Sequence, residues 1–429
     1  MEGTPPEKPE RPAEKPKLPP ETLEPPEPAA EPARRPAPTP LVLARRLRSR
    51  IPVSPLPWHW SRRLRWGALI AVVALVGGGA IASVLLQGDD SSSDRPALGA
   101  NVSPKVEKLV RGMPLEQKLD TVLVAGFDDP DRLPAGSPGG VLITAENWPG
   151  DRGAKALTAK LHGSGQIPPL IVTQQEGGDH RALSDLPPAE NELEIGAIGT
   201  PEAAEAWALG TGRALSSRGI DLNLAPVADV ATLDSPVSDR AFGDDPPVVA
   251  ELTAASVRGC AKSGVACAVS HFPGLGGASG DTEDGPATVG LDTASLENRD
   301  LPPFRAAFEA KVPAVVLSLA LYAAYDPVTP GALSSAIAED LLRDQLGFKG
   351  VALTGDLSSG AIAAGQGAPE AATAALAAGA DMIVISDPRE AQEARQAIGS
   401  AAGEGGLPDD RLDQAVARVL ELKQRLGLL

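Results

Sequence analysis

Acidic, basic and hydroxyl side chains gather in four short motifs, each placed directly after an apolar run of strand length. Carboxyl groups and imidazoles act as general acids, bases and nucleophiles, and arginine and serine side chains can hold a polar ligand. The chain therefore has the residue types that acid–base chemistry on a polar substrate requires. The candidate residues are Glu176, Arg240, Ser270, His271, Asp281, Glu283 and Asp356.

The apolar runs predict the elements that must position these side chains. Ala-, Glu- and Arg-rich stretches with helical spacing lie between the runs, for example residues 201–218, 248–262 and 301–310. Near-continuous apolar strands that alternate with helices indicate a parallel sheet covered on both faces. The eight runs are residues 121–125, 140–144, 170–173, 221–226, 265–270, 314–319, 351–354 and 382–386.

Eight such units within residues 105–429 predict an α/β fold of the TIM (β/α)8 barrel type. An open doubly wound sheet is the competing architecture, although no Gly-x-Gly-x-x-Gly follows the first strand, as it does in dinucleotide-binding sheets. In a barrel the functional residues lie at the carboxyl ends of the strands and on the loops that follow. We therefore expect the four polar motifs to meet at one end of the barrel.

The composition excludes several classes of partner. A formal net charge of −17 over 429 residues argues against nucleic acid, which requires clustered Lys and Arg. The two cysteines, Cys260 and Cys267, are too few for a disulfide-stapled scaffold. The favoured interpretation is that both are small residues of the core. The alternative is a disulfide between them in an oxidising compartment. Two of the four histidines, His59 and His162, are remote from the others, so we expect no metal site and no cofactor.

The chain ahead of the barrel has three parts of contrasting composition. Residues 1–66 form a predicted cytoplasmic tail, which is Pro-rich and disordered over residues 1–40 and basic beyond them. Residues 67–87 carry no charge and have about the length of a bilayer core, which predicts one transmembrane helix rather than a cleaved signal peptide. Residues 88–104 form a linker to the barrel.

The charges that flank the predicted span indicate its orientation. Seven arginines lie between residues 45 and 65 on its N-terminal side, whereas Asp89 and Asp90 follow it. By the positive-inside rule, these charges predict a single-pass protein of the cell membrane with a cytoplasmic N-terminus and an extracytoplasmic barrel. The Pro-rich tail would offer polyproline II segments to a cytoplasmic partner.

Residues 270–276 read SHFPGLG and residues 281–283 read DTE. This frame resembles the signature K-H-F-P-G-H-G-x-x-x-x-D-x-H of glycoside hydrolase family 3, in its single-domain β-N-acetylhexosaminidase branch. The resemblance extends over nearly all of residues 105–429 and implies the same barrel. Other stretches that resemble the family are residues 219–230, 239–246, 346–351 and 378–382.

The resemblance implies a retaining glycosidase, in which a carboxylate attacks the anomeric carbon and an acid/base serves first the leaving group and then water. The family pattern T-D-x-L places the nucleophile at Gly355, and Asp356 is the next residue. Consecutive strand residues face opposite sides, so Asp356 should point away from the substrate and act as a helix N-cap or loop acceptor. Glu283 stands where the family has its acid/base histidine, and Asp281 where it has the aspartate that orients that histidine.

The resemblance also implies a set of sugar ligands. Arg240 and His271 match ligands of the family, and Ser270 replaces the lysine that precedes the histidine. A structural ion pair of Arg240 with Asp229 or Asp239 is an equal alternative to substrate binding.

Residues 174–179 read QQEGGD, where the family has D-Q-E-G-G-R. The first aspartate and the last arginine of that pattern are therefore absent here. Glu176 remains as a candidate ligand, although a buried structural glutamate bonded to backbone amides is the favoured interpretation. The adjacent His180 has no counterpart in the family and is expected at the surface.

The catalytic positions thus depart from the family together, while the barrel motifs remain. This pattern favours a membrane-anchored, extracytoplasmic family 3-like protein that is catalytically impaired and binds cell-wall glycan of the peptidoglycan type or a protein partner. The alternative is an active retaining glycosidase for terminal β-N-acetylglucosamine-type bonds, with Glu283 as acid/base and Asp356 as a displaced nucleophile. A third hypothesis makes the Pro-rich tail the functional part of the chain.

Overall fold

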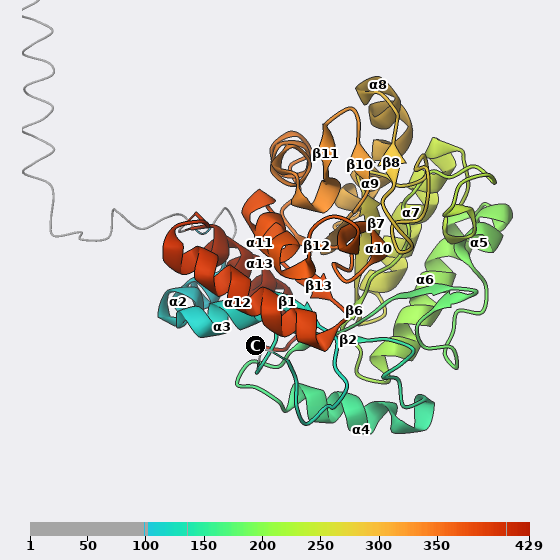
Figure 1. Ribbon diagram of the computed structural model, residues 1–429. Helices are drawn as coiled ribbons and strands as arrows, with labels where there is room; N and C mark the ends of the chain where they lie inside the picture. The colour runs from blue at the N-terminus through green and yellow to red at the C-terminus, as the bar shows by residue number, and fades with distance from the viewer. Residues whose placement is uncertain (1–97, 99–101, 135, 409) are drawn as a thin grey trace, which may run out of the picture. The chain divides into compact units, whose positions relative to one another are not determined.

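Eight parallel strands form one closed sheet in the computed structural model (Figure 1). Their order is β12-β9-β7-β6-β3-β2-β1-β13, and a parallel bridge between Leu353 of β12 and Met382, just before β13, closes the barrel. The strands are β1 (Leu123–Ala125), β2 (Gly140–Ile143), β3 (Leu170–Thr173), β6 (Leu222–Asn223), β7 (Ala266–Phe272), β9 (Ala314–Leu317), β12 (Val351–Thr354) and β13 (Ile383–Ile385). The residues that the structure describes are 98, 102–134, 136–408 and 410–429.

Every one of the eight predicted apolar runs supplies a strand of this barrel. The predicted TIM-type fold is therefore confirmed, and the open doubly wound sheet is excluded. The run over residues 221–226 forms only the short β6, in keeping with the inability of Pro226 to donate to a strand ladder.

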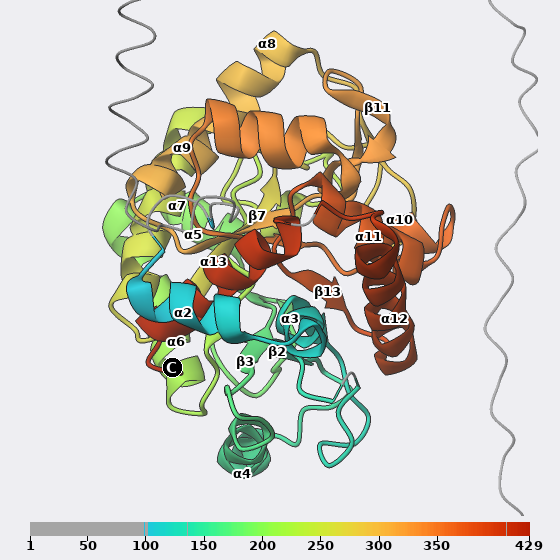
Figure 2. The same ribbon diagram turned by 90° about the vertical axis from the view of Figure 1, so that its left-hand side faces the viewer.

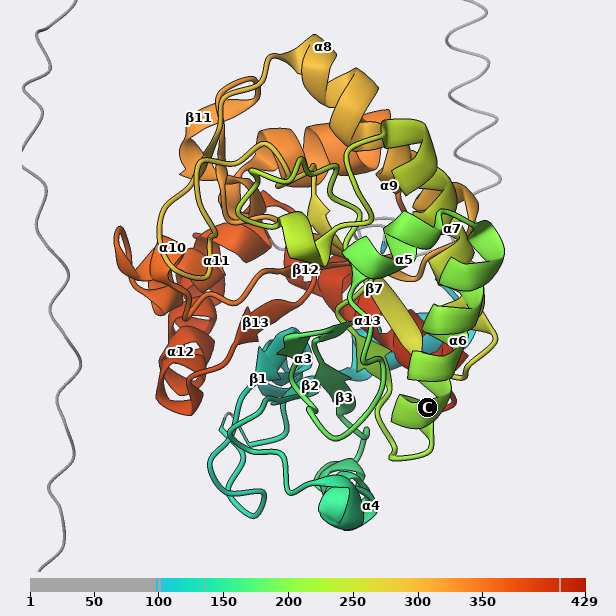
Figure 3. The same cartoon turned by 90° about the vertical axis from the view of Figure 1, so that its right-hand side faces the viewer.

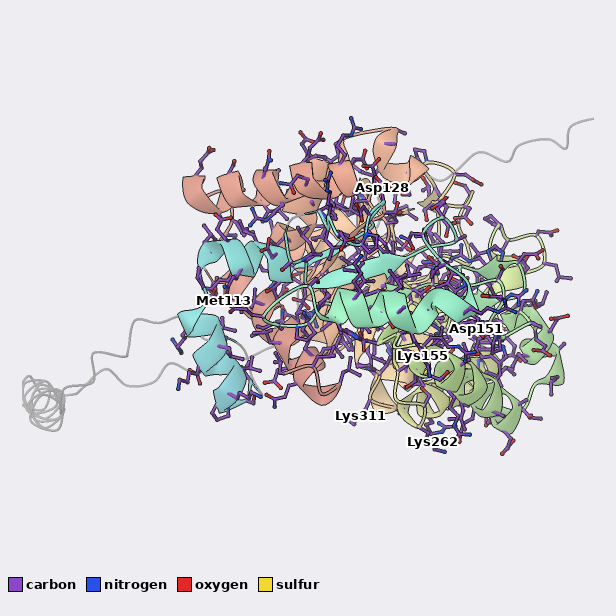
Figure 4. All side chains as sticks on the ribbon, turned by 90° about the horizontal axis from the view of Figure 1, so that it is seen from below. Met113, Asp128, Asp151, Lys155, Lys262 and Lys311 are labelled. Atoms are coloured by element: carbon purple, nitrogen blue, oxygen red, sulfur yellow. The ribbon has the colours of Figure 1, made fainter. Side chains whose placement is uncertain are left out.

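Helices cover the outside of the barrel, and the three helices predicted from spacing are present as α6, α7 and α9. These three lie along one flank, and α11 and α12 lie along another (Figure 3). Asp151, the first residue of α4, pairs with Arg218 at 2.6 Å on the molecular surface (Figure 4). The covering helices are α4 (Asp151–His162), α6 (Pro201–Ser216), α7 (Pro246–Ala261), α9 (Leu301–Glu309), η4 (Ala336–Gln345), α11 (Ala368–Ala378) and α12 (Pro388–Glu404).

The first repeat departs from the predicted alternation of strands and helices. The described residues between β1 and β2 contain no helix, and the sequence of this connection, GFDDPDRLPAGSPG, is rich in the Gly and Pro that interrupt helices.

The remaining elements are α2 (Pro104–Gly112), α3 (Leu115–Thr121), β4 (Gln175–Gly177), β5 (His180–Arg181), α5 (Glu192–Ile198), η1 (Ser238–Arg240), β8 (Thr288–Val289), α8 (Thr293–Ser295), η2 (Leu296–Asp300), β10 (Leu321–Tyr322), β11 (Asp326–Pro330), η3 (Gly331–Leu333), α10 (Gly360–Ala363) and α13 (Arg411–Arg425).

The interior of the barrel is filled by aliphatic side chains, and α13 closes its amino-terminal end. Val419 and Leu422 of α13 belong to the same buried cluster as the inward-facing strand residues. The helix α2 packs beside α13 (Figure 2), and the Ser103 amide donates to Glu421 Oε1 at 2.5 Å. The interior of the barrel is thus closed by α13 at the amino-terminal ends of its strands.

A buried carboxylate joins three elements near β13. Asp381 is fully buried and accepts from Arg343 Nη2 at 2.6 Å, Arg411 Nη2 at 2.8 Å and Arg418 Nη1 at 2.8 Å. Burial alone would raise the pKa of Asp381, but the three guanidinium groups lower it to about 2. The carboxylate therefore stays ionised and fixes η4 and α13 to the start of β13.

A second buried carboxyl group lies behind the loop that follows β7. Asp300, at the end of η2, is fully buried, and neither carboxyl oxygen has a hydrogen-bond partner among the described residues. Burial raises the pKa of Asp300 to about 7, an effect that Arg299 opposes and Asp229 reinforces. Gly274 packs against it with φ +129°, and a Cβ there would lie 2.6 Å from Asp300 Cβ, so this loop position requires glycine.

The two cysteines lie together in the core. Cys260 near the end of α7 and Cys267 on β7 are both buried and are free thiols. The side-chain hydrogen bond from Cys260, together with burial, raises the pKa of the Cys267 thiol well above its ordinary value. They match the predicted pair of small core residues.

The predicted tail, transmembrane helix and most of the linker lie outside the described residues. Among the helices that are described, none is both long and apolar enough to cross a membrane.

We expect Asp381→Asn to lower the free energy of unfolding by about 3–5 kcal/mol, because the change leaves three buried or partly buried arginines without their carboxylate. Urea unfolding followed by circular dichroism would measure this loss. The matched control is Asp340→Asn at an exposed position, which should leave the free energy of unfolding nearly unchanged. A loss below about 1 kcal/mol for Asp381→Asn would contradict the inference that this carboxylate holds η4 and α13 to β13.

We expect Asp300→Asn to stabilise the protein at pH 8 by a few kcal/mol and to have little effect at pH 4. Because the pKa of Asp300 is about 7 in the fold against 3.8 ordinarily, the folded form keeps a proton that the unfolded chain loses. The free energy of unfolding of the wild type should therefore fall as pH rises from about 4 to 7. Urea titrations of both proteins across this pH range would measure the free energies of unfolding. If these depended on pH in the same way for both proteins, the raised pKa of Asp300 would be refuted.

Candidate functional site

A cavity of about 480 Å³ lies at the carboxyl ends of the barrel strands. Its wall includes His271 near the end of β7 and residues that follow β2, β3, β12 and β13, among them Thr144, Gln174, Asp356 and Ser386. A larger hollow of about 930 Å³ lies at the opposite end, beside α2 and Lys423 of α13, and holds none of the predicted site residues. The polar motifs thus meet at one end of the barrel, as the spacing predicted.

The seven candidate residues divide between the cavity wall and a network behind it. Those in the wall are Ser270, His271, Glu283 and Asp356; those in the network are Glu176, Arg240 and Asp281. Among the described residues, no group of three or more His, Cys, Asp or Glu side chains is arranged to hold a metal ion.

Arg240 is the centre of the network. Its Nε and Nη2 donate to Glu176 Oε2 at 2.7 Å and Oε1 at 2.9 Å, a bidentate pair. Its Nη1 lies 3.2 Å from Asp281 Oδ2 and 3.3 Å from Glu283 Oε1. Nη2 also lies 3.3 Å from His271 Nε2. Every nitrogen of the guanidinium therefore faces a protein acceptor.

The charges of this network are stabilised by its ion pairs against the effect of burial. The Arg240 and Glu176 side chains are each 1% exposed. Burial alone would raise the pKa of Glu176, but the charge and hydrogen bonds of Arg240 hold it below its ordinary value. Burial opposes the charged form of Arg240 as well, yet the surrounding carboxylates raise its pKa. Both groups are therefore ionised. The prediction that Arg240 pairs with Asp229 or Asp239 was wrong, because its partner is Glu176. The prediction that backbone amides bind Glu176 was wrong for the same reason.

His271 is held between Arg240 and a buried aspartate. Its Nδ1 lies 2.8 Å from Asp229 Oδ2, and the other Asp229 oxygen accepts from the Leu275 amide at 2.7 Å. The imidazole therefore lies between a guanidinium, which can only donate, and a carboxylate, which can only accept. Both ring nitrogens face partners inside the protein.

Asp356 lies in the cavity wall, but one of its oxygens is committed to the backbone. Oδ1 accepts from the Ser358 amide at 3.0 Å and the Ser386 amide at 2.9 Å, the loop role that the sequence predicted. The expected alternation of faces does not apply, since β12 ends at Thr354 and Asp356 is in the following loop. A Cβ on Gly355 would lie 3.0 Å from Leu319 Cγ, so Leu319 crowds the space that a side chain there would need.

Ser270 and His180 complete the polar wall. Ser270 is 1% exposed, and its hydroxyl has no hydrogen-bond partner among the described residues. His180 was predicted to be a surface residue, but it lines the cavity and its Nε2 lies 3.0 Å from Asp239 Oδ2. The β4–β5 hairpin explains this placement, because the turn at Gly177 and Gly178 folds β5 back over the mouth of the barrel.

The sequence gave no indication of one buried carboxyl group behind the network. Glu192, the first residue of α5, is fully buried, and its Oε1 accepts from the Val227 amide at 2.8 Å. Burial raises the pKa of Glu192 well above its ordinary value, and the neighbouring carboxylates Glu176 and Asp229 add to the rise. Acidic residues in a first helical turn are normally solvated, so only the fold reveals this orientation.

Comparisons with known proteins agree with this architecture. The model of the glycosyl hydrolase family 3 N terminal domain matches residues 133–422. A β-hexosaminidase of Stenotrophomonas maltophilia strain K279a is 32% identical over 308 residues, which is 66% of this chain and 91% of that protein.

Solved structures give the same result. A family 3 β-N-acetylglucosaminidase from Paenibacillus sp. aligns with a TM-score of 0.70 and 32% identity over 74% of this chain and 63% of that one. A β-N-acetylhexosaminidase from Beutenbergia cavernae aligns with a TM-score of 0.64 and 32% identity over 73% of this chain and 99% of that one. Since the family model also covers more than half of its length, the chain belongs to glycoside hydrolase family 3 and is similar to its β-hexosaminidases.

Proposed function

We propose that this protein is a membrane-anchored, extracytoplasmic member of family 3 that binds glycan of the peptidoglycan type and is impaired in hydrolysis. The observation that carries the proposal is the engagement of its polar groups inside the protein. Arg240 and His271, the two sugar ligands expected from the family, have all their nitrogens directed at protein partners.

The nucleophile position supports impairment. Retaining hydrolysis requires two carboxyl groups about 5–5.5 Å apart, one of them free to attack the anomeric carbon. Gly355 offers no side chain, and Leu319 crowds the space beside it. Asp356 retains one oxygen without a backbone donor, but its orientation is fixed by the amides that bind Oδ1.

The acid/base position supports the same conclusion. A carboxyl group that donates a proton near neutral pH is usually kept in an apolar pocket away from cations. The Glu283 side chain is 59% exposed and lies 3.3 Å from the Arg240 guanidinium, so it is neither in an apolar pocket nor away from a cation. Asp281 shares the same guanidinium, so it no longer serves as the partner of an acid/base residue.

The membrane anchor rests on the sequence. The uncharged residues 67–87 are long enough for a bilayer, and the arginines before them favour a cytoplasmic tail. A cavity that opens at the strand ends of an extracytoplasmic barrel would then meet cell-wall glycan.

An active glycosidase is the second candidate. One observation favours it, because Asp356 and Glu283 line the same cavity. Movement of the loop that carries Glu283 away from Arg240 would be required to bring the two carboxyl groups into a working pair.

We incubate the full-length protein with an activated aryl β-N-acetylglucosaminide between pH 4 and 8. We expect it to release no more of the aryl group than a heat-inactivated sample does. The same protein should bind purified peptidoglycan in a pull-down assay. The variants Asp356→Asn and Glu283→Gln should show no turnover either, like the wild type. Turnover that disappears in Asp356→Asn would establish the active alternative, and failure to bind any glycan would refute the binding role.

We expect the full-length protein to sediment with cell membranes and a variant without residues 1–87 to remain in the soluble fraction. Protease added to intact spheroplasts should digest the barrel of the full-length protein, because the proposed orientation places it outside. A barrel that resists protease until the cells are lysed would contradict this orientation.

A further inference from the structure

The charges of the cavity point to a more specific ligand. Resting on the proposed glycan binding, we propose that the cavity selects a hexosamine with a free, protonated amino group over the N-acetylated sugar. The ammonium group would pair with wall carboxylates that have no ion-pair partner in the protein, and the sugar hydroxyls would bind the unpaired oxygens around it.

Three carboxylates in the wall have no cationic partner. Glu146 Oε2 accepts only from the Thr144 hydroxyl at 3.0 Å, and Asp356 accepts from backbone amides. Within the described part of the chain, Asp179 has neither a hydrogen bond nor an ion pair through its side chain. A cavity with several unpaired carboxylates attracts a cation, and charge-assisted hydrogen bonds to an ammonium are stronger than those to a neutral amide.

The basic groups of the wall do not neutralise these carboxylates. The Arg181 Nε and Nη1 donate to the Gly178 carbonyl at 2.6 Å and the Leu186 carbonyl at 3.3 Å. His180 pairs with Asp239, and His271 Nδ1 pairs with the buried Asp229. No lysine is among the described residues that line the cavity. An anionic ligand would therefore meet excess negative charge.

A buried hydroxyl is an independent sign of a ligand. Ser270 lines the cavity with 1% of its surface exposed, and its Oγ has no partner among the described residues. The Oγ of Ser359, a partly exposed residue that is also in the wall, likewise has no partner among the described residues. A hydroxyl without a partner is costly to bury, and both oxygens can donate to and accept from a sugar.

Hydrogen bonds and charge must dominate recognition in this cavity. The described lining contains no Phe, Trp or Tyr, the large rings on which a sugar face often stacks. The acidic excess of the protein also lies within residues 98–429, because residues 1–97 have more Lys and Arg than Asp and Glu. This field favours the approach of a cation over that of a neutral sugar.

The test is isothermal titration of the full-length protein in detergent at pH 6 and low salt. The probes are β-1,4-linked glucosamine disaccharide, its di-N-acetylated form, cellobiose and cadaverine. We expect the glucosamine disaccharide to bind at least about tenfold more tightly than either neutral disaccharide, and the preference to fall at high salt. Cadaverine should bind more weakly, because it lacks the hydroxyls that would reach Ser270 and Ser359.

Two variants assign the effect to the cavity. Asp356→Asn keeps an oxygen for the amides of Ser358 and Ser386 but removes the charge, so it should reduce the preference for the free amine roughly fivefold. The exposed Asp340→Asn should leave the preference intact.

The outcomes separate this inference from the proposed function. Equal or tighter binding of the di-N-acetylated disaccharide would overturn the inference and leave glycan binding in place. Equal binding of cadaverine would overturn it in favour of a general amine site. Failure of all three disaccharides to bind would overturn the proposed glycan binding itself.

Discussion

The buried guanidinium of Arg240 is the constraint on which the functional end of the barrel depends. A charge with 1% exposure is tolerated only when its donors are fully paired, because desolvation is otherwise too costly. Glu176 after β3 and His271, Asp281 and Glu283 from β7 and its loop all converge on it. The loops of the neighbouring strands are thereby held in one arrangement.

This pairing also decides what the cavity can offer to a ligand. The residues that resemble family ligands are satisfied by one another, whereas Ser270, Ser359, Asp179 and Asp356 retain unpaired oxygens on the side of the wall. Under the proposed function, recognition would rest on these unpaired oxygens rather than on Arg240 and His271. A member of a hydrolase family can keep its architecture while its polar groups serve another purpose.

The periodicity of apolar runs predicts the fold well, because each strand is buried on both faces and so needs a nearly continuous apolar sequence. The Gly and Pro residues in 126–139 explain why no helix is described between β1 and β2, but this explanation requires knowing where the two strands lie. The partners of Arg240 could not be predicted, since Glu176 lies 64 residues away and ion-pair choice depends on loop geometry. For the same reason the burial of Glu192 and the position of His180 emerge only from the packing of α5 and the β4–β5 hairpin.

The bond between Ser103 and Glu421 has a mechanical consequence. The chain enters the barrel at the end sealed by α13, opposite the mouth of the cavity. A force applied at Ser103 would therefore load α2 and α13 first, and would reach the strand ends only through the whole length of the barrel. The geometry of the cavity is thus insulated from tension at the point where α2 begins.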